Sequence, residues 1–201
     1  MNAGAGETFF VTRASIFERI RAKEPAQREL AWCDFRAKYA PIVAGFCKAM
    51  GASGQDIDDI VQDVMLGFLG VSEEFRYSPV RGRFRGFLKV CTVRAVQRRP
   101  GKNLRHRGKP LEEIPADDLA IDHVWNDVWE QELLARALDQ LRRELGGTTA
   151  FQAFEQYVLL DRPAEAVANE FGTSVNNVHQ AKTRMTRQLR ETLQKLREME
   201  D

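Results

Sequence analysis

The sequence predicts an all-α fold of two small helical domains joined by a flexible linker, with a helix-turn-helix as the C-terminal domain. Apolar residues recur at helical spacing along most of the 201 residues, and no segment alternates as a strand would. Residues 101–120 lack this periodicity and contain Pro110 and Pro115. We therefore expect a first domain at residues 1–100, a linker at 101–120 and a second domain at 121–201.

The first domain is expected to contain four helices. Their residue ranges are 12–22, 25–50, 55–70 and 86–99. Pro41 lies inside the second range and predicts a kink or a helix restart, because proline lacks the backbone donor of a helix interior. The core-facing stripe of the third helix is formed by Ile57, Ile60, Val61, Val64 and Phe68.

The second domain is expected to begin with a long helix that ends at Gly146. Its apolar positions are Val124, Val128, Leu134, Leu138 and Leu141. Helices at 151–160, 163–171 and 174–199 follow. Gly172 can supply a left-handed turn residue, and Thr173 with Ser174 offers an N-cap for the last helix. With Val167, Ala168, Phe171, Val178 and Ala181 inward, the spacing matches a helix-turn-helix.

The outward face of the last helix is polar and carries no acid. Amide, hydroxyl and guanidinium groups of this kind bond base edges and phosphates in a major groove. The candidate contacts are Asn176, Asn177, His179, Gln180, Lys182, Thr183, Arg184 and Arg187. A solvated face on an ordinary helical hairpin is the alternative. We interpret His179 as a DNA contact because no second ligand stands at metal-binding spacing.

Charge is distributed unevenly, although the net charge is only +1. Residues 75–109 contain twelve Lys or Arg and no acid, whereas residues 112–130 contain seven acids and no Lys or Arg. Residues 171–190 are again purely basic. Local fields, and not the average charge, decide which partner docks at each segment.

The helix at 55–70 carries an acidic stripe. Asp59, Gln62, Asp63 and Leu66 fall on one face, opposite the apolar stripe. Acids at the start of a helix also favour its dipole, so a solvated face explains the stripe when it is considered alone. Because the stripe ends in an exposed Leu66, it is also a credible docking surface.

The segment that follows the acidic helix interleaves aromatic rings with arginines over residues 75–89. Rings stack on unpaired bases and guanidinium groups hold phosphates, so this pattern suits single-stranded nucleic acid. The alternative is that Phe75, Phe84 and Phe87 belong to the core and the arginines are merely solvated. Unopposed like charges need a counter-charge, which favours the nucleic-acid interpretation.

Other classes of site have little support. Cys33, Cys47 and Cys91 form no CxxC pair and lie in apolar contexts, so we expect buried thiols in a reducing compartment. We expect no catalytic residues, no metal site and no cofactor, since no nucleophile–base pair or phosphate loop occurs. No stretch approaches the length of a membrane span, so we expect a cytoplasmic protein without membrane insertion.

The order of these motifs resembles the extracytoplasmic-function (ECF) sigma factors of the sigma-70 family. The resemblance covers about residues 12–196 and rests on the acidic helix, the sequence Arg-Gly-Arg-Phe-Arg-Gly-Phe-Leu from Arg81, a basic helix, a linker and a helix-turn-helix. The opening around Phe17, with Trp32, Phe35 and Tyr39, resembles a subgroup of these factors that is common in planctomycete-type bacteria. This resemblance implies a non-catalytic transcription initiation factor.

The resemblance also implies roles and partners. Its expected partners are core RNA polymerase, through the β′ clamp and the β flap, the −10 and −35 promoter elements and, as in many relatives, an anti-sigma factor. The polymerase-binding set is Asp56, Asp58, Asp59, Gln62, Asp63 and Leu66. The −10 set is Phe75, Arg76, Tyr77, Arg81, Arg83, Phe84, Arg85, Phe87, Lys89, Arg94 and Arg98. The −35 set is the outward face of the last helix, and the acidic linker corresponds to the segment that enters the polymerase cleft.

The chain departs from the family at three positions, and other classes remain open. The family usually has Trp at the position of Phe87, often Asn at Arg94 and Asp near Arg98, so its −10 preference does not carry over.

A stand-alone helix-turn-helix regulator explains the C-terminal domain equally well. It leaves the acidic helix and the Phe/Arg segment without a task. A metal-dependent isoprenoid synthase would need a second acidic motif facing residues 58–63, and none occurs.

Overall fold

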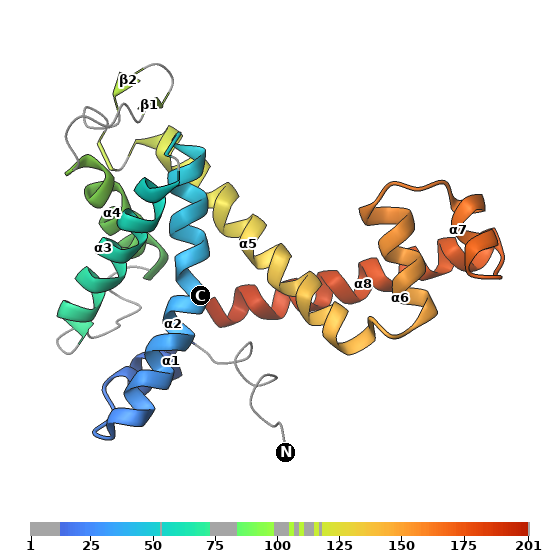
Figure 1. Ribbon diagram of the computed structural model, residues 1–201, viewed down its shortest axis with the longest axis horizontal. Helices are drawn as coiled ribbons and strands as arrows, with labels where there is room; N and C mark the ends of the chain where they lie inside the picture. The colour runs from blue at the N-terminus through green and yellow to red at the C-terminus, as the bar shows by residue number, and fades with distance from the viewer. Residues whose placement is uncertain are drawn as a thin grey trace. The chain divides into compact units, whose positions relative to one another are not determined.

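The computed structural model describes residues 13–52, 54–72, 84–98, 105–106, 109–110, 115–116 and 118–200, which form an all-α protein with one very short strand pair (Figure 1). The chain divides into two compact units, Met1–Glu132 and Leu133–Asp201. The division falls inside a helix and beyond the linker that the sequence predicts.

The first unit contains the four expected helices, the strand pair and the first part of a fifth helix. These elements are α1 (Arg13–Ile20), α2 (Pro25–Ala49), α3 (Gln55–Ser72), α4 (Phe84–Gln97), β1 (Arg105–His106), β2 (Lys109–Pro110) and α5 (Leu119–Leu145). The antiparallel strand pair has only two residues in each strand and was not expected from the sequence. Helix α2 does not restart at Pro41 but continues to Ala49, with Tyr39 and Ile42 on either side of the proline buried in the core.

Aromatic side chains form the core of the first unit. The rings of Phe35 and Phe68 stack with centroids 4.3 Å apart, and Phe84 meets Phe17 edge-on at 5.0 Å. Tyr39 joins the same cluster, with its ring 4.9 Å from that of Phe84. Such pairs stabilise a core by about 0.5–1.5 kcal/mol each beyond the burial of their area. The cluster therefore fixes α1, α2, α3 and the start of α4 together.

The first part of α5 belongs to this unit. Trp125 and Trp129, one turn apart, are both buried at 1% exposure. The Trp125 ring meets Phe46 at 5.3 Å, and the Trp129 ring meets Tyr39 at 6.2 Å. A Cβ at Gly45 would lie only 3.0 Å from a methyl carbon of Val128, so the glycine permits close approach of α2 and α5. The first compact unit thus extends past residue 121, where the sequence predicts the second domain to begin.

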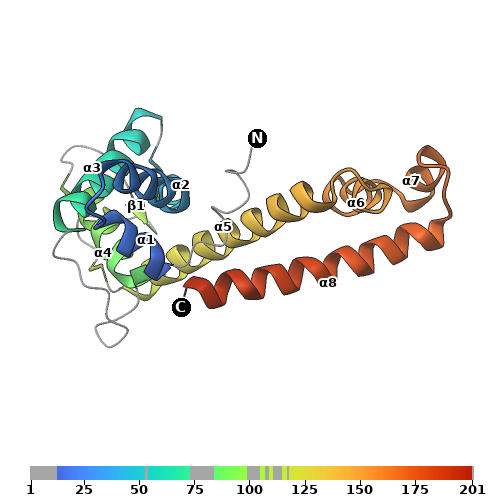
Figure 2. The ribbon, with the colours of Figure 1, turned by 90° about the horizontal axis from the view of Figure 1, so that it is seen from below.

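The second unit contains the rest of α5 and four further helical elements. They are α6 (Thr149–Phe154), the π-helix η4 (Glu155–Leu159), α7 (Ala164–Glu170) and α8 (Val175–Glu200), with α6 and α7 beside α8 (Figure 2). One cluster joins Leu141, Phe151, Phe154 and Met185, and a second joins Ala153, Val167, Ala168 and Val178. The structure thus divides the expected helix 151–160 into α6 and η4.

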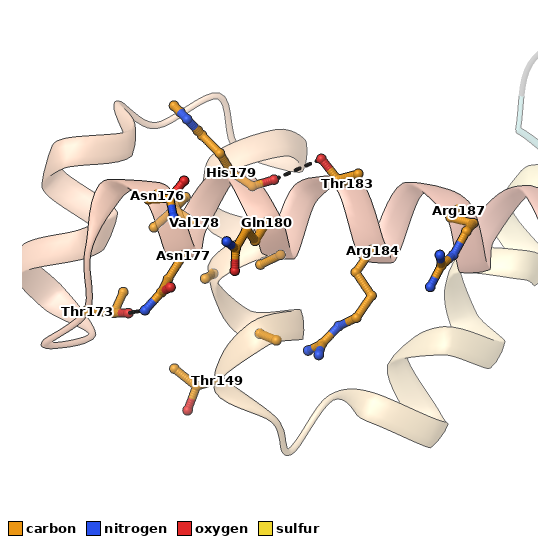
Figure 3. A pocket seen from close by; sticks show the side chains of 13 residues that line it. Thr149, Thr173, Asn176, Asn177, Val178, His179, Gln180, Thr183, Arg184 and Arg187 are labelled. Atoms are coloured by element: carbon orange, nitrogen blue, oxygen red, sulfur yellow. Dashed lines mark hydrogen bonds between the residues drawn. The ribbon is translucent and has the colours of Figure 1, made fainter.

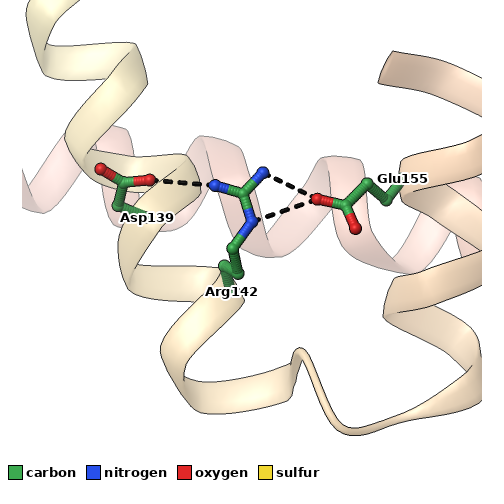
Figure 4. Close-up of polar contacts among 3 residues, drawn as sticks. All are labelled: Asp139, Arg142 and Glu155. Carbon is green, nitrogen blue, oxygen red and sulfur yellow. Dashed lines mark hydrogen bonds and ion pairs between the residues drawn. The ribbon is translucent and has the colours of Figure 1, made fainter. Parts of the chain in front are cut away.

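A polar network on the surface ties α5 to η4. The Arg142 guanidinium donates to Glu155 Oε1 from Nη2 at 2.7 Å and from Nε at 3.1 Å, and to Asp139 Oδ1 at 3.1 Å (Figure 4). The hydrogen bond from Arg142 to Glu155 raises the pKa of the guanidinium. Thr148 also caps α6 by accepting a hydrogen bond from the Phe151 amide. These contacts fix the elements that support α8.

Candidate nucleic-acid and polymerase interfaces

The turn between α7 and α8 has the expected features. Gly172 has a φ of 59°, in the left-handed region that glycine adopts without strain. The Asn177 amide donates to Ser174 Oγ at 3.1 Å, which confirms the predicted N-cap of α8. Val167, Val178 and Ala168 are buried together, as expected, whereas Phe171 is only half-buried. The geometry leaves the opposite face of α8 toward solvent.

All eight residues of the predicted −35 set are exposed. Seven of them line a groove of about 750 Å³, together with the start of α6 (Figure 3). They are Asn176, Asn177, His179, Gln180, Thr183, Arg184 and Arg187. Sequence reasoning missed Thr149, which lines the other wall. Its position becomes visible only when α6 packs against α8.

Three of these side chains have polar partners within the unit. Thr183 Oγ1 donates to the His179 carbonyl oxygen at 3.1 Å. The Asn177 side-chain amide donates to Thr173 Oγ1 at 3.0 Å, which holds it against the turn. Arg187 Nε lies 3.9 Å from Glu191 Oε1, an exposed pair of little energetic weight. Gln180 and Arg184 lie one turn apart in the groove and reach into it (Figure 3). Both side chains are therefore accessible to a ligand of the groove.

Lys182 lies on the flank of α8 and does not line the groove. Its Nζ is 5.3 Å from the centroid of the Tyr157 ring, and the His179 ring is 5.6 Å from the same ring. Tyr157 comes from η4 and is half-buried. These contacts of Tyr157 could not be predicted from the sequence, because they depend on how η4 packs beside α8.

The exposed face of α3 combines acids with apolar side chains. Gln62, Asp63 and Leu66 are exposed as predicted, whereas Asp59 and Asp56 are only half-exposed. Leu69, which the sequence analysis did not single out, extends the face with 42% exposure beside the 54% of Leu66. Of the predicted inward stripe, Ile60, Val64 and Phe68 are buried, and Met65 replaces the half-buried Ile57 and Val61.

The structure corrects the predicted −10 set at Phe84. Only 1% of its side chain is exposed, and it packs inside the aromatic core, so it cannot stack on a base in this structure. Phe87 is half-buried against Phe68, with ring centroids 6.3 Å apart. Arg94 on α4 and Arg98, the residue after its end, are both exposed. Five members lie outside the described residues, namely Phe75, Arg76, Tyr77, Arg81 and Arg83.

Two cations of α4 are held by α5. Arg85 Nη2 donates to Asn126 Oδ1 at 2.6 Å, and its guanidinium carbon lies 5.1 Å from the Trp129 ring centroid. Lys89 forms an ion pair with Asp122. Residues 112–130 thus supply part of the counter-charge that the basic segment needs. The sequence showed both charge runs but not which side chains would meet.

The cysteines differ from the expectation of three buried thiols. Cys47 is buried, Cys91 is half-buried and Cys33 is exposed. Burial raises the pKa of the Cys91 thiol, while Arg94 and Arg98 act in the opposite direction. In the described residues no group of three or more His, Cys, Asp or Glu could hold a metal ion, and no helix there is long and apolar enough to cross a bilayer.

These features define an all-α protein with an exposed acidic and apolar face on α3 and an exposed basic and polar face on α8. Residues 35–106, which include most of α2 and all of α3 and α4, match the family model for sigma-70 region 2. Region 2 of that family contacts core RNA polymerase and the −10 element. The match supports a sigma-70 family member with a role in transcription initiation. Comparison with curated proteins and with solved structures finds no match.

Proposed function

We propose that the chain is a sigma factor of the ECF type, which carries core RNA polymerase to a promoter and helps to open it. The observation that carries this proposal is the region 2 match across α3 and α4. In the proposal, the face of α3 with Asp63, Leu66 and Leu69 docks on the polymerase β′ clamp. The exposed mixture of acids and leucines suits a partner surface with both basic and apolar groups.

The second unit is proposed to be a region 4 helix-turn-helix that docks on the β flap and reads the −35 element. Support comes from the exposed groove along α8, which no acid lines. An arginine can bond a guanine through two acceptors in the major groove, and a glutamine can bond an adenine in the same way. Arg184 and Gln180 therefore specify bases in this proposal, while Lys182 and Arg187 position the duplex through phosphates.

The −10 element is proposed to bind the α4 side of the first unit. Arg94 on α4 and Arg98 just after it are exposed cations that suit a phosphate backbone. Capture of an unpaired base by Phe75 or Tyr77 stays a prediction from the sequence. Phe84 is removed from this role because it is buried in the core.

Run-off transcription with cognate core polymerase on genomic fragments tests the proposal. We expect discrete transcripts that core polymerase alone does not make, and loss of these transcripts with Arg184→Ala. Tight, sequence-specific binding of the free chain to duplex DNA, without any polymerase-dependent transcript, would instead favour a stand-alone helix-turn-helix regulator.

A further inference from the structure

The junction of α4 and α5 brings the chain's most basic segment against its most acidic one. Two polar contacts join them through separate side chains, Arg85 with Asn126 and Lys89 with Asp122. A second acid, Glu130, approaches Arg85 Nη1 at 3.9 Å. Asp122, Asn126 and Glu130 stand four residues apart, so they form one stripe along α5. We call this stripe the acidic face of α5.

The acidic face of α5 meets the cations of α4 as a strand of nucleic acid would. Its carboxylates stand beside Lys89 and Arg85, and the Trp129 ring stacks under the Arg85 guanidinium. Phosphates and base rings offer the same two kinds of contact to a basic groove. A helix and a nucleic-acid strand cannot occupy the same cations at once.

We propose that the acidic face of α5 is an intramolecular competitor of nucleic acid, which masks Arg85 and Lys89 of α4 in the free chain. This inference rests on the proposed function, because it requires α4 to be a nucleic-acid surface. The ligand that displaces the acidic face is single-stranded nucleic acid. Its phosphates must interact with Arg85 and Lys89 more favourably in free energy than Glu130 and Asp122 do.

The contact is built so that a ligand can displace it. The side chains of Glu130 and Asp122 keep 41% and 38% of their exposure, so solvent and salt screen both ion pairs. A polar groove of about 550 Å³ opens between α4 and α5 at this place. Trp125 Nε1 is buried with no hydrogen-bond partner among the described residues. An unsatisfied buried donor makes the packing of α5 in the first unit less stable than a fully hydrogen-bonded interface would be.

The test compares two single neutralisations on the same helix in the full chain. Asp122→Asn removes the charge that faces Lys89. Asp127→Asn removes an equal charge from an exposed position that lines no part of the α4–α5 groove. Affinity for a labelled single-stranded DNA oligonucleotide is measured by fluorescence anisotropy at low salt, without polymerase. Thermal melting of each variant verifies that the fold is retained.

We expect Asp122→Asn to raise the affinity about threefold over Asp127→Asn, the size of one exposed ion pair. Glu130→Gln should add a further gain. Adding Lys89→Gln should remove the gain from Asp122→Asn, because no masked cation is then released. Equal affinities for the two neutralised variants would overturn the proposal, as would a gain that persists in the Lys89→Gln background.

Failure of this inference is separable from failure of the proposed function. A chain that directs run-off transcription but shows no difference between Asp122→Asn and Asp127→Asn is a sigma factor without the mask. A chain that directs no transcription but gains affinity with Asp122→Asn has the mask on a nucleic-acid surface that serves another purpose.

Discussion

Lys182 extends over the face of Tyr157, with Nζ 5.3 Å from the ring centroid, and does not line the groove that Arg184 lines. The aromatic face attracts the ammonium group, so the lysine stays charged while its side chain is held near the ring. Tyr157 therefore restricts the position of Lys182, which in the proposed function contacts a phosphate of the DNA backbone.

Lys182→Ala is expected to weaken binding to all duplex sequences about equally and to lower the slope of log K against log salt by about one. Tyr157→Leu should have a smaller effect of the same kind, because the lysine stays charged but is no longer held in place. Titrations at several salt concentrations measure both. Lys195→Ala, an exposed lysine further along α8, is the control. A change in base preference with Lys182→Ala would contradict the positioning role.

Arg184→Ala should behave differently, because Arg184 lines the groove one turn from Gln180. We expect a loss of about 1–3 kcal/mol at the preferred −35 sequence and relaxed preference at one base pair. Binding selection from a randomised −35 library measures that preference. If Arg184→Ala weakens all sequences equally while Lys182→Ala changes the preference, the rotation of α8 on the DNA is opposite to the one proposed.

The exposed face of α3 should matter for polymerase binding and little for folding. Asp63→Ala with Leu66→Ala is expected to lower affinity for core polymerase while the free energy of unfolding changes by about 0.5 kcal/mol or less per site. Both side chains are exposed, so neither supports the core. Glu165→Ala, an exposed acid on α7, is the matched control. Unchanged polymerase affinity in the double variant would remove α3 from the interface.

The folding unit at the N-terminus should extend through α5 to residue 132. Trp129→Ala is expected to destabilise the chain by about 3–5 kcal/mol, as for other buried tryptophans. A fragment of residues 1–132 should unfold cooperatively. A fragment of residues 1–100 should be much less stable, because Phe46 and Tyr39 lose their covering rings. Urea unfolding followed by circular dichroism compares the two, and equal stabilities would restore the boundary that the sequence predicts.

The sequence predicted the helices well because apolar spacing and turn residues report local structure. Gly172 and Ser174 located the turn before α8, and Val167 with Val178 identified its buried side. These signals act over a few residues and need no knowledge of distant packing.

The phase of α5 could not be predicted in the same way. Val124 and Val128 stand at the same spacing as Trp125 and Trp129, so two adjacent stripes both suit a helix. The structure buries the tryptophans and leaves the valines half-buried, because the larger rings fill the space over Phe46 and Tyr39. The domain boundary and the contacts of Arg85 follow from that choice. Charge runs alone could not have identified them.

Cys91 reports on the basic surface of α4, because it lies within one or two turns of Arg94 and Arg98. Burial raises the pKa of its thiol, so the protonated form persists to higher pH and the reactive thiolate is scarce at neutral pH. The raised pKa also affects the free energy of unfolding. The neutral thiol contributes stability that is fully present below the ordinary pKa of 9.0, and this contribution is lost as pH rises through the raised pKa. Iodoacetamide should therefore modify exposed Cys33 first, half-buried Cys91 slowly and buried Cys47 last, as mass spectrometry of timed samples would resolve.

Because Arg94 lowers the Cys91 pKa, Arg94→Gln should slow modification of Cys91 further and leave Cys33 unchanged. Single-stranded DNA that binds α4 should slow Cys91 in the parent chain in the same way, by neutralising both arginines. Modification of Cys91 at an unchanged rate with saturating DNA would place the nucleic acid away from this part of α4.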